Sequence, residues 1–136
     1  MDYQKIMDFR NQRSAFAKRM GIEVVELREG YARAVKMIHE EDTNPLGRAH
    51  GAVLFAVADT ACGSAACSYG KKAVTLNSTY NFLRGGAVGD LITAEAREVK
   101  HGATISVYDA VVTDQDGKLV GSATMTFYTM DESLDL

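Results

Sequence analysis

A run of small and apolar residues from His50 to Ser68, HGAVLFAVADTACGSAACS, constrains the fold of this chain more than any other stretch. A helix built from it carries small or apolar side chains on every face, whereas a surface helix carries one apolar stripe. We therefore expect a helix that is buried on all sides. Its only formal charge is Asp59. An enclosed carboxylate is costly unless it binds something, takes part in a reaction or is satisfied by a hydroxyl or an amide across the core.

The same run approaches the length of about 20 residues that a membrane span needs. It contains few Leu or Ile and carries Asp59 near its centre, so we expect a core helix and no membrane partner. The first residues, MDYQKIMDFRNQRSAF, include early acids and no long apolar stretch. This pattern predicts neither a secretory signal nor a span, and a cytoplasmic location is expected.

The composition sets limits on the partners and on the number of domains. A length of 136 residues fits one domain spanning the whole chain. A net charge of −3 gives no reason to expect nucleic acid as a partner, so any anionic ligand must be held by local cations. Cys62 and Cys67 are five residues apart on the expected helix, which favours two core fillers over a disulfide. No Cys or His pair has zinc spacing, and no metal is expected.

The pattern on either side of the buried run predicts one flanking helix and six strands. Residues 2–20 have a helical apolar face formed by Ile6, Phe9, Phe16 and Met20. Strands are expected at 22–28, 31–38, 73–82, 91–100, 104–113 and 119–129, separated by turn-forming residues. Residues 39–49 are predicted to be a loop, and residues 130–136 a frayed tail. The expected class is α+β, with a mostly antiparallel sheet of about six strands wrapped around one long buried helix.

Three stretches of the sequence resemble a known family. They are GRAHGAVLFAVADTACGSAAC, NFLRGGAVGD and VKHGATISVYDAVVTDQDGKLVGSAT. The HG pair with AD later in the helix, and the FLR-x-G-x-x-GD turn, resemble the hotdog-fold acyl-CoA thioesterases of the phenylacetic-acid-degradation (PaaI) type, over about residues 22–127. The resemblance implies hydrolysis of an aryl- or medium-chain acyl-CoA, with coenzyme A as part of the substrate and no separate cofactor. One departure is Ala52, where the family usually has a second glycine.

Thioester hydrolysis needs a group that activates water or attacks the carbonyl, and a donor to the developing negative charge. Asp59 can act as general base or nucleophile, and the free amide of Gly51 can be the donor. These residues are eight positions apart, about 12 Å along a helix, so one helix cannot bring both to the same reacting group. Two antiparallel helices across a twofold axis can. We therefore expect a homodimer with shared sites, which the resemblance also implies, and a pairing of dimers.

Two further residues precede or begin the buried helix. By resemblance, Asn44 and His50 help Gly51 to orient water or the thioester. As alternatives, Asn44 is an ordinary turn residue and His50 a helix-start residue. A nucleophilic role for Ser64 or Cys62 lacks an elbow motif around either residue.

Coenzyme A carries phosphates that require cations and backbone amides. By resemblance, the residues that border the pantetheine and nucleotide path are Tyr80, Asn81, Arg84, Gly85, Lys100, His101, Gly102 and Thr104. A solvated turn is the alternative for Lys100 and His101. The acyl group is expected between the two helices, near Leu54 and Phe55.

Two other functions fit the same pattern. A hotdog dehydratase acting on a hydroxyacyl thioester would use a histidine with an acid, and His50 with Asp59 across the interface could supply that pair. A non-catalytic acyl-CoA-binding module would bind without turnover, independently of Asp59.

Overall fold

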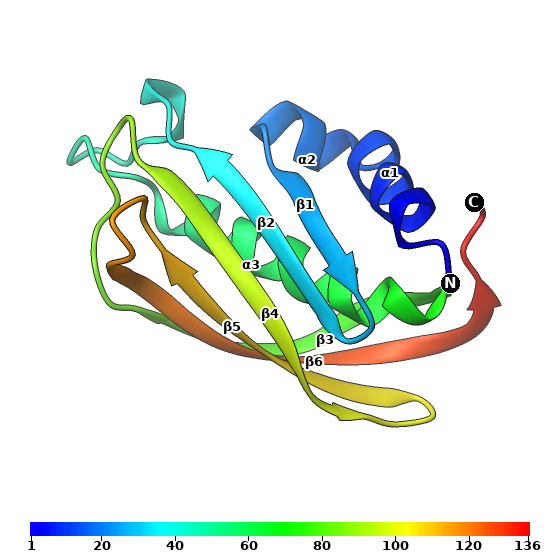
Figure 1. The fold of residues 1–136 in the computed structure, drawn as a ribbon. Helices are drawn as coiled ribbons and strands as arrows, with labels where there is room; N and C mark the ends of the chain where they lie inside the picture. Colours follow the sequence, from blue (N-terminus) through cyan, green and yellow to red (C-terminus); the bar gives the residue numbers. More distant parts are fainter.

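The structure is a computed structural model that describes residues 1–136. Its elements are α1 (Tyr3–Arg13), α2 (Ala15–Met20), β1 (Glu23–Arg28), β2 (Tyr31–Met37), the 3-10 turn η1 (Glu40–Asp42), α3 (Gly51–Ala66), the 3-10 turn η2 (Cys67–Tyr69), β3 (Lys71–Phe82), β4 (Leu91–His101), β5 (Ile105–Thr113) and β6 (Leu119–Ser133) (Figure 1). The strands form one antiparallel sheet in the order β1-β2-β4-β5-β6-β3. The predicted class is confirmed, because this sheet encloses a single long helix.

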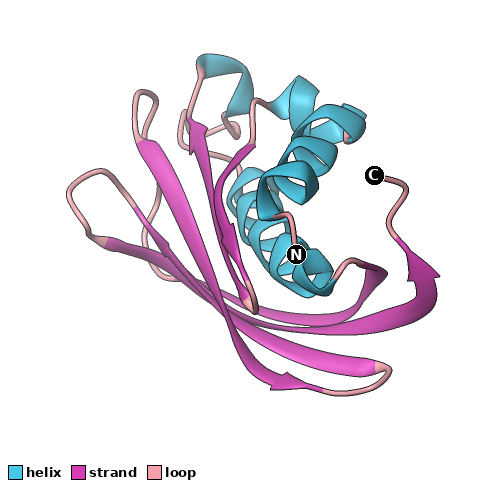
Figure 2. Ribbon diagram, turned by 45° about the vertical axis from the view of Figure 1, so that its right-hand side comes forward, coloured by secondary structure: helices cyan, strands magenta, loops and turns pink.

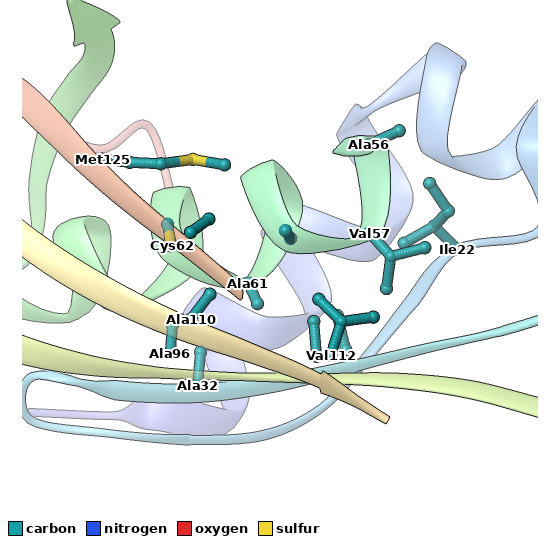
Figure 3. Packing of buried hydrophobic residues seen from close by; sticks show 14 of the residues in the cluster. Ile22, Ala32, Ala56, Val57, Ala61, Cys62, Ala96, Ala110, Val112 and Met125 are labelled. Atoms are coloured by element: carbon teal, nitrogen blue, oxygen red, sulfur yellow. The ribbon is translucent and has the colours of Figure 1, made fainter. Parts of the chain in front are cut away.

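The sheet curves around α3, and α1 and α2 lie beside the helix on its other side (Figure 2). Alanine is concentrated on one part of the sheet face toward the helix, where the almost completely buried residues of β2, β4 and β5 include Ala32, Ala34, Ala94, Ala96 and Ala110. Methyl side chains allow the helix to approach the sheet closely, and Val57, Ala61 and Cys62 of α3 fill the space between them (Figure 3). The small residues of the opening run therefore pack against this alanine-rich part of the sheet.

One helical stretch, Gly51–Tyr69, is long and apolar enough by composition to cross a membrane. It consists of α3 and η2, which occupy the concave side of the sheet (Figure 1). Burial among the strands identifies it as the core helix of the fold, as the sequence predicts.

The prediction that this helix is buried on all sides is wrong for the single chain. Gly51, Phe55 and Asp59 are only partly buried and Ala52 is exposed, whereas most other residues of α3 are buried. Gly51, Phe55 and Asp59 recur every four residues and therefore form one stripe along the helix, beside which Ala52 is exposed and Thr60 is partly buried. The hydropathy pattern does not reveal this stripe, because small residues are equally suited to a buried core and to a close contact at the surface of the helix.

The flanking segment is two helices and not one. Ser14 leaves the helical conformation, with φ −84° and ψ 100°, and its hydroxyl accepts a hydrogen bond from the amide of Ala17. This cap starts α2 in a new direction. Phe16, which was expected on the apolar face, is therefore 53% exposed, and Ala17 is buried instead.

The C-terminal residues are also more ordered than predicted. Strand β6 continues to Ser133, and the amide of Leu134 donates to the carbonyl of Gly70. Lys72 forms ion pairs with Glu132 and Asp135. The charges that suggested a frayed tail are therefore paired with a lysine on β3, while the other predicted strand ends lie within two residues of the observed ones.

Strand β3 lies at one edge of the sheet and contains a bulge at Leu76. Thr75 pairs with Phe127, but the next pair joins Asn77 to Thr126, so Leu76 has no partner across the ladder. An extra residue shifts the alternation of side chains by one position. Thr75 faces the helix before the bulge, and Tyr80 faces it afterwards.

Candidate active site

The first turn of α3 presents a free amide. The ring of His50 caps the helix, because its Nδ1 accepts a hydrogen bond of 3.0 Å from the amide of Ala52. The carbonyl of His50 accepts from the amide of Val53. The amide of Gly51 makes no hydrogen bond within the chain. An unpaired donor at a helix N-terminus suits an oxygen atom that gains negative charge.

The carboxylate of Asp59 lies two turns further along the same stripe. Its Oδ1 accepts a hydrogen bond of 2.7 Å from Oγ1 of Thr75. Oδ2 of Asp59 has no hydrogen-bond partner within the chain. Thr75 remains exposed although it faces the helix, because β3 is the edge strand and nothing in the chain covers it. The arrangement holds one oxygen atom of the carboxylate and leaves the other free at an open edge.

Three aromatic rings line the space between α3 and β3. The rings of Phe55 and Tyr80 are 5.9 Å apart, and those of Tyr80 and Phe82 are 4.4 Å apart. Burial raises the pKa of Tyr80 to about 12, so its hydroxyl stays neutral. A Cβ atom on Gly51 would lie 3.0 Å from the ring of Phe82, so a larger residue there would require this ring to move. Phe82 was not among the predicted site residues, although the FLR motif contains it.

A cavity of about 310 Å³ opens beside the Gly51 amide. Its lining residues are Ala49, Gly51, Leu54, Phe82, Leu83, Arg84 and Gly85. Arg48 lies next to it and donates from Nη2 to the carbonyl of Gly85 at 3.2 Å. Neither Arg48 nor Arg84 forms a salt bridge. Two guanidinium groups without a direct ion pair lie beside one cavity, although both are close enough to Asp90 to lower the pKa of its carboxyl group. They can hold an anion, and Arg48 is a residue that the sequence reasoning missed.

The loop before α3 uses Asn44 as a turn residue. Its Oδ1 accepts hydrogen bonds from the amides of Leu46 and Arg48, at 2.9 and 3.1 Å. The side-chain amide nitrogen has no partner within the chain and is free to donate a hydrogen bond.

A second cavity of about 410 Å³ lies on the other side of the first turn of α3. Its lining residues are Arg19, Met20, Glu41, Asp42, Thr43, His50, Ala52 and Val53.

Some of the predicted site residues lie away from the Gly51 cavity in the single chain. Asn81 is one of them, and a group near the β4–β5 turn is described below. Asn81 pairs with Ser122 on the outer face of the sheet, because side chains alternate along β3 and its neighbour Tyr80 faces inward. Asn81 therefore cannot reach the Gly51 cavity.

The other group lies near the turn between β4 and β5. It consists of Lys100, His101, Gly102 and Thr104. The ring of His101 stacks on that of Tyr69, 3.7 Å away, just after the end of α3. The Gly51 cavity lies at the start of α3, and the helix is about 24 Å long at 1.5 Å per residue. Within one chain the two groups of residues therefore lie at opposite ends of the helix.

The nucleophile alternatives lose support from their surroundings. Cys62 and Cys67 are buried and form no disulfide. Burial raises the pKa of the Cys62 thiol, which keeps it protonated. Ser64 donates to the carbonyl of Thr60 and accepts from Arg10, so its hydroxyl is part of the packing between α1 and α3. No group of three or more His, Cys, Asp and Glu side chains is placed to hold a metal ion.

Comparison with known proteins places this geometry in a family. The Thioesterase superfamily profile matches residues 46–121. The acyl-coenzyme A thioesterase PaaI of Escherichia coli K12 is 36% identical over 109 residues, which cover 80% of this chain and 78% of that protein. The structure of E. coli PaaI superposes with a TM-score of 0.93 and 30% identity, over 96% of this chain and 95% of the other.

Two streptococcal structures are also similar. A Streptococcus mutans UA159 protein bound to acetyl CoA has a TM-score of 0.79 and 31% identity, over 83% of this chain and 91% of that chain. A hypothetical thioesterase from Streptococcus pneumoniae TIGR4 with coenzyme A has a TM-score of 0.79 and 31% identity, over 83% and 88% of the two chains. The chain belongs to the thioesterase superfamily, as a hotdog-fold thioesterase of the PaaI type.

Proposed function

We propose that this chain hydrolyses acyl-CoA thioesters with aryl or medium-chain acyl groups, releasing a free acid and coenzyme A. The observation that carries the proposal is the stripe on α3. On this incompletely buried face of the helix lie the free amide of Gly51 and the carboxylate of Asp59, which accepts a hydrogen bond from Thr75. Family membership supports thioester hydrolysis, and the similar E. coli protein is named an acyl-coenzyme A thioesterase.

The reaction uses the free oxygen atom of Asp59 and the Gly51 amide of a second chain. Oδ2 of Asp59 takes a proton from water as the water oxygen bonds to the thioester carbon, or Oδ2 attacks that carbon itself. The carbonyl oxygen becomes negative and accepts a hydrogen bond from the Gly51 amide. When the oxyanion collapses, the carbon–sulfur bond breaks and the thiolate of coenzyme A leaves. In the general-base route the thiolate takes the proton that Asp59 accepted from water. In the nucleophilic route the acyl group is left as an anhydride with Asp59, which water hydrolyses to the free acid, supplying the proton for the thiolate. No cofactor besides the coenzyme A of the substrate is required.

The two groups are about 12 Å apart along one helix, so the proposed site is shared by two protomers. The outer edge of β3 has no partner strand, and Val74 and Leu76 on it are 44% and 56% exposed. Exposed apolar side chains on a free edge favour pairing with another strand. Two copies of β3 paired across a twofold axis would set the two α3 helices antiparallel. We expect such dimers to pair into tetramers.

The same pairing supports a path for coenzyme A along the interface. It brings the β4–β5 turn, with Lys100 and His101, toward the start of the partner's helix. Arg84 and Arg48 would hold phosphate beside the Gly51 cavity. Phe55 and Tyr80 would contact the acyl group or the pantetheine arm. Leu54 is 2% exposed and reaches the path only through that cavity.

His50 and Asn44 have supporting roles in this proposal. Because Nδ1 of His50 accepts the helix-cap hydrogen bond, its ring proton is on Nε2, which can donate to water or substrate. The free side-chain amide of Asn44 can do the same. A dehydratase would need His50 as a base, and a ring that caps the helix through its unprotonated nitrogen does not favour that role. The proposed location of the enzyme is the cytoplasm.

The test is a panel of aryl-, medium-chain and 3-hydroxyacyl-CoA substrates, assayed for free thiol and for enoyl product. We expect thiol release, and a loss of roughly hundredfold or more in kcat for Asp59→Asn, because the amide cannot take a proton or attack. Asp109→Asn is the matched control, since Asp109 accepts a similar threonine hydrogen bond on the outer face of the sheet. Absence of thiol release from every acyl-CoA would refute the proposal. Enoyl product would favour the dehydratase, and tight binding without turnover the binding module.

A further inference from the structure

Lys36 and Asp42 form a buried ion pair that has no part in the steps above. Nζ of Lys36 lies 2.9 Å from Oδ2 of Asp42, and the two side chains are 2% and 5% exposed. Lys36 occupies an inward position on β2, on the same face as the core residues Ala32 and Ala34. Burying two charges costs free energy even when they are paired, and apolar side chains of similar size often serve the fold as well. The pair therefore needs an explanation other than packing.

The hydrogen bonds of Asp42 connect the sheet to the start of α3. Its Oδ2 accepts from the amide of His39 at 2.8 Å as well as from Lys36. Its main-chain carbonyl accepts from the amide of His50 at 2.8 Å. Lys36 also donates to the carbonyl of Met37 at 3.2 Å, so the ammonium is fixed on β2. A rigid strand is therefore linked through Asp42 to the residue that precedes Gly51.

His50 in turn determines the direction of the Gly51 amide. Its ring and its carbonyl hold the amides of Ala52 and Val53, which leaves the amide of Gly51 as the free donor of the first turn. Next to His50, the amide of Ala49 donates to the carbonyl of Gly86 at 2.9 Å, Arg48 donates to the carbonyl of Gly85, and Ala49 forms a β-bridge with Thr43. Without the ion pair, the hydrogen bond from the His50 amide to the Asp42 carbonyl can still form, but Asp42 itself would no longer be anchored to β2 through Lys36.

We propose that Lys36 and Asp42 are positioning residues that aim the Gly51 amide at the oxygen atom on which negative charge develops. The inference rests on the proposed function, because it assigns a role within that reaction. Correct placement of such a donor matters at small distances, since a displacement of about 1 Å can cost on the order of a hundredfold in rate. The buried charges are explained if two strong, directional bonds are needed at this place.

The test compares the parent with a double variant that carries both Lys36→Met and Asp42→Asn. This variant removes both charges together, so no unpaired charge stays buried, and asparagine can still accept from the amide of His39. We expect kcat for an acyl-CoA to fall roughly tenfold to a hundredfold while KM rises at most several-fold, because a misdirected donor weakens the charged transition state more than the neutral carbonyl of the substrate. Arg28→Met with Glu26→Gln removes an exposed ion pair on β1, at the opposite edge of the sheet from β3, and should leave kcat unchanged.

Binding of two inert analogues separates positioning from general damage. A ketone analogue of acyl-CoA, with methylene in place of sulfur, keeps the carbonyl oxygen that the Gly51 amide would hold. A thioether of coenzyme A lacks that oxygen atom. We expect the double variant to lose several-fold in affinity for the ketone and little for the thioether. Equal losses for both analogues would overturn the inference.

Each remaining outcome also decides the question. If the first double variant does not fold, Lys36→Gln with Asp42→Asn keeps a hydrogen-bonded neutral pair and takes its place. Failure of both variants to fold would overturn the inference in favour of a purely stabilising pair. A folded variant with kcat within twofold of the parent would also overturn it while the proposed function stands. A parent that releases no thiol from acyl-CoA would instead refute the proposed function, and the inference with it.

Discussion

Oγ1 of Thr75 donates a 2.7 Å hydrogen bond to Oδ1 of Asp59 across the open space between the edge strand and the core helix. The hydroxyl holds one oxygen atom of the carboxylate and leaves Oδ2, the oxygen atom proposed to react, without a hydrogen-bond partner in the chain. Nothing in the chain covers Thr75, so this contact lies where a second chain and a substrate can reach it.

Thr75→Ala should lower kcat by about tenfold and leave the fold intact, because a hydrogen bond to a charged group contributes about 1.5 kcal/mol or more to its placement. Thr75→Ser keeps the hydroxyl and should retain most of the activity. Steady-state kinetics with the best acyl-CoA of the panel measures both. Thr124→Ala breaks the similar bond to Asp109 on the outer face and is the control. Equal effects of the alanine variants at 75 and 124 would contradict a role for Thr75 in the reaction.

Mixing two inactive variants should restore activity if the sites are shared. Gly51→Leu removes the close approach at the amide, because even a Cβ atom there meets Phe82, and Asp59→Asn removes the carboxylate. Half of the dimers from an equal mixture are mixed, and each mixed dimer has one intact site, so about one quarter of the parent activity is expected. Refolding or co-expressing the two chains and measuring thiol release is the test. Each variant alone stays inactive, and a mixture as inactive as its components would argue against the shared site.

The two arginines beside the Gly51 cavity should distinguish substrates with phosphate from substrates without it. Arg84→Gln and Arg48→Gln should each raise KM for an acyl-CoA by about tenfold, as expected when a charge-assisted hydrogen bond is lost. The same variants should leave KM unchanged for the matching acyl-pantetheine thioester, which has no phosphate. Arg13→Gln on α1 is the control. Parallel changes for both substrates would show that the arginines act on something other than the phosphates.

The Lys36–Asp42 pair should make the fold sensitive to acid. Burial alone raises the pKa of Asp42, but the amide of His39 and the ammonium of Lys36 outweigh it and bring this pKa below its ordinary value of 3.8. A carboxyl group with a lowered pKa in the folded state stabilises the protein above its unfolded value and loses that contribution as the pH falls through the folded value. The free energy of unfolding should therefore fall below about pH 4.

Urea unfolding of the parent and of Lys36→Met with Asp42→Asn, from pH 3 to pH 7, measures this contribution. As the pH falls, the parent should lose more free energy of unfolding than the double variant, so the stability of the parent relative to the double variant should decrease. Asp90 also has a lowered pKa, because it accepts hydrogen bonds from Ala87 and Gln115, but it is present in both proteins and cancels in the difference. A difference that does not change with pH would contradict the assignment.

Much of the fold could be predicted because the strongest sequence signals are local. The helical run depends on composition, and five of the six strands end within two residues of their predicted bounds because alternation and glycine turns mark them. The break at Ser14 was missed because it depends on a single hydrogen bond between a hydroxyl group and an amide. The spacing of apolar residues, from which the helix was predicted, contains no trace of such a cap. The end of β6 was missed because ion pairs with Lys72 hold residues that look like a solvated tail.

For the candidate site, Gly51 and Asp59 could be found because a glycine and an acid stand out in an apolar run. Thr75 and Arg48 could not, because threonine in a strand and arginine in a loop are ordinary, and their role arises only from contacts distant in sequence. A regular strand would turn Val74, Leu76 and Tyr80 to the same face. The bulge puts Val74 with Tyr128 on the outer face instead, and this change has no signature in hydropathy.

The unpaired Leu76 makes the chemistry depend on the length of β3 as well as on its residues. A deletion of this single leucine would give a more regular ladder with the same remaining side chains. It would also give the segments before and after it a single alternation of side chains, so that either Thr75 or Tyr80 would point to the outer face of the sheet instead of toward α3. In this chain, a change in the length of β3 by one residue should therefore disturb the site more than most single substitutions along the strand.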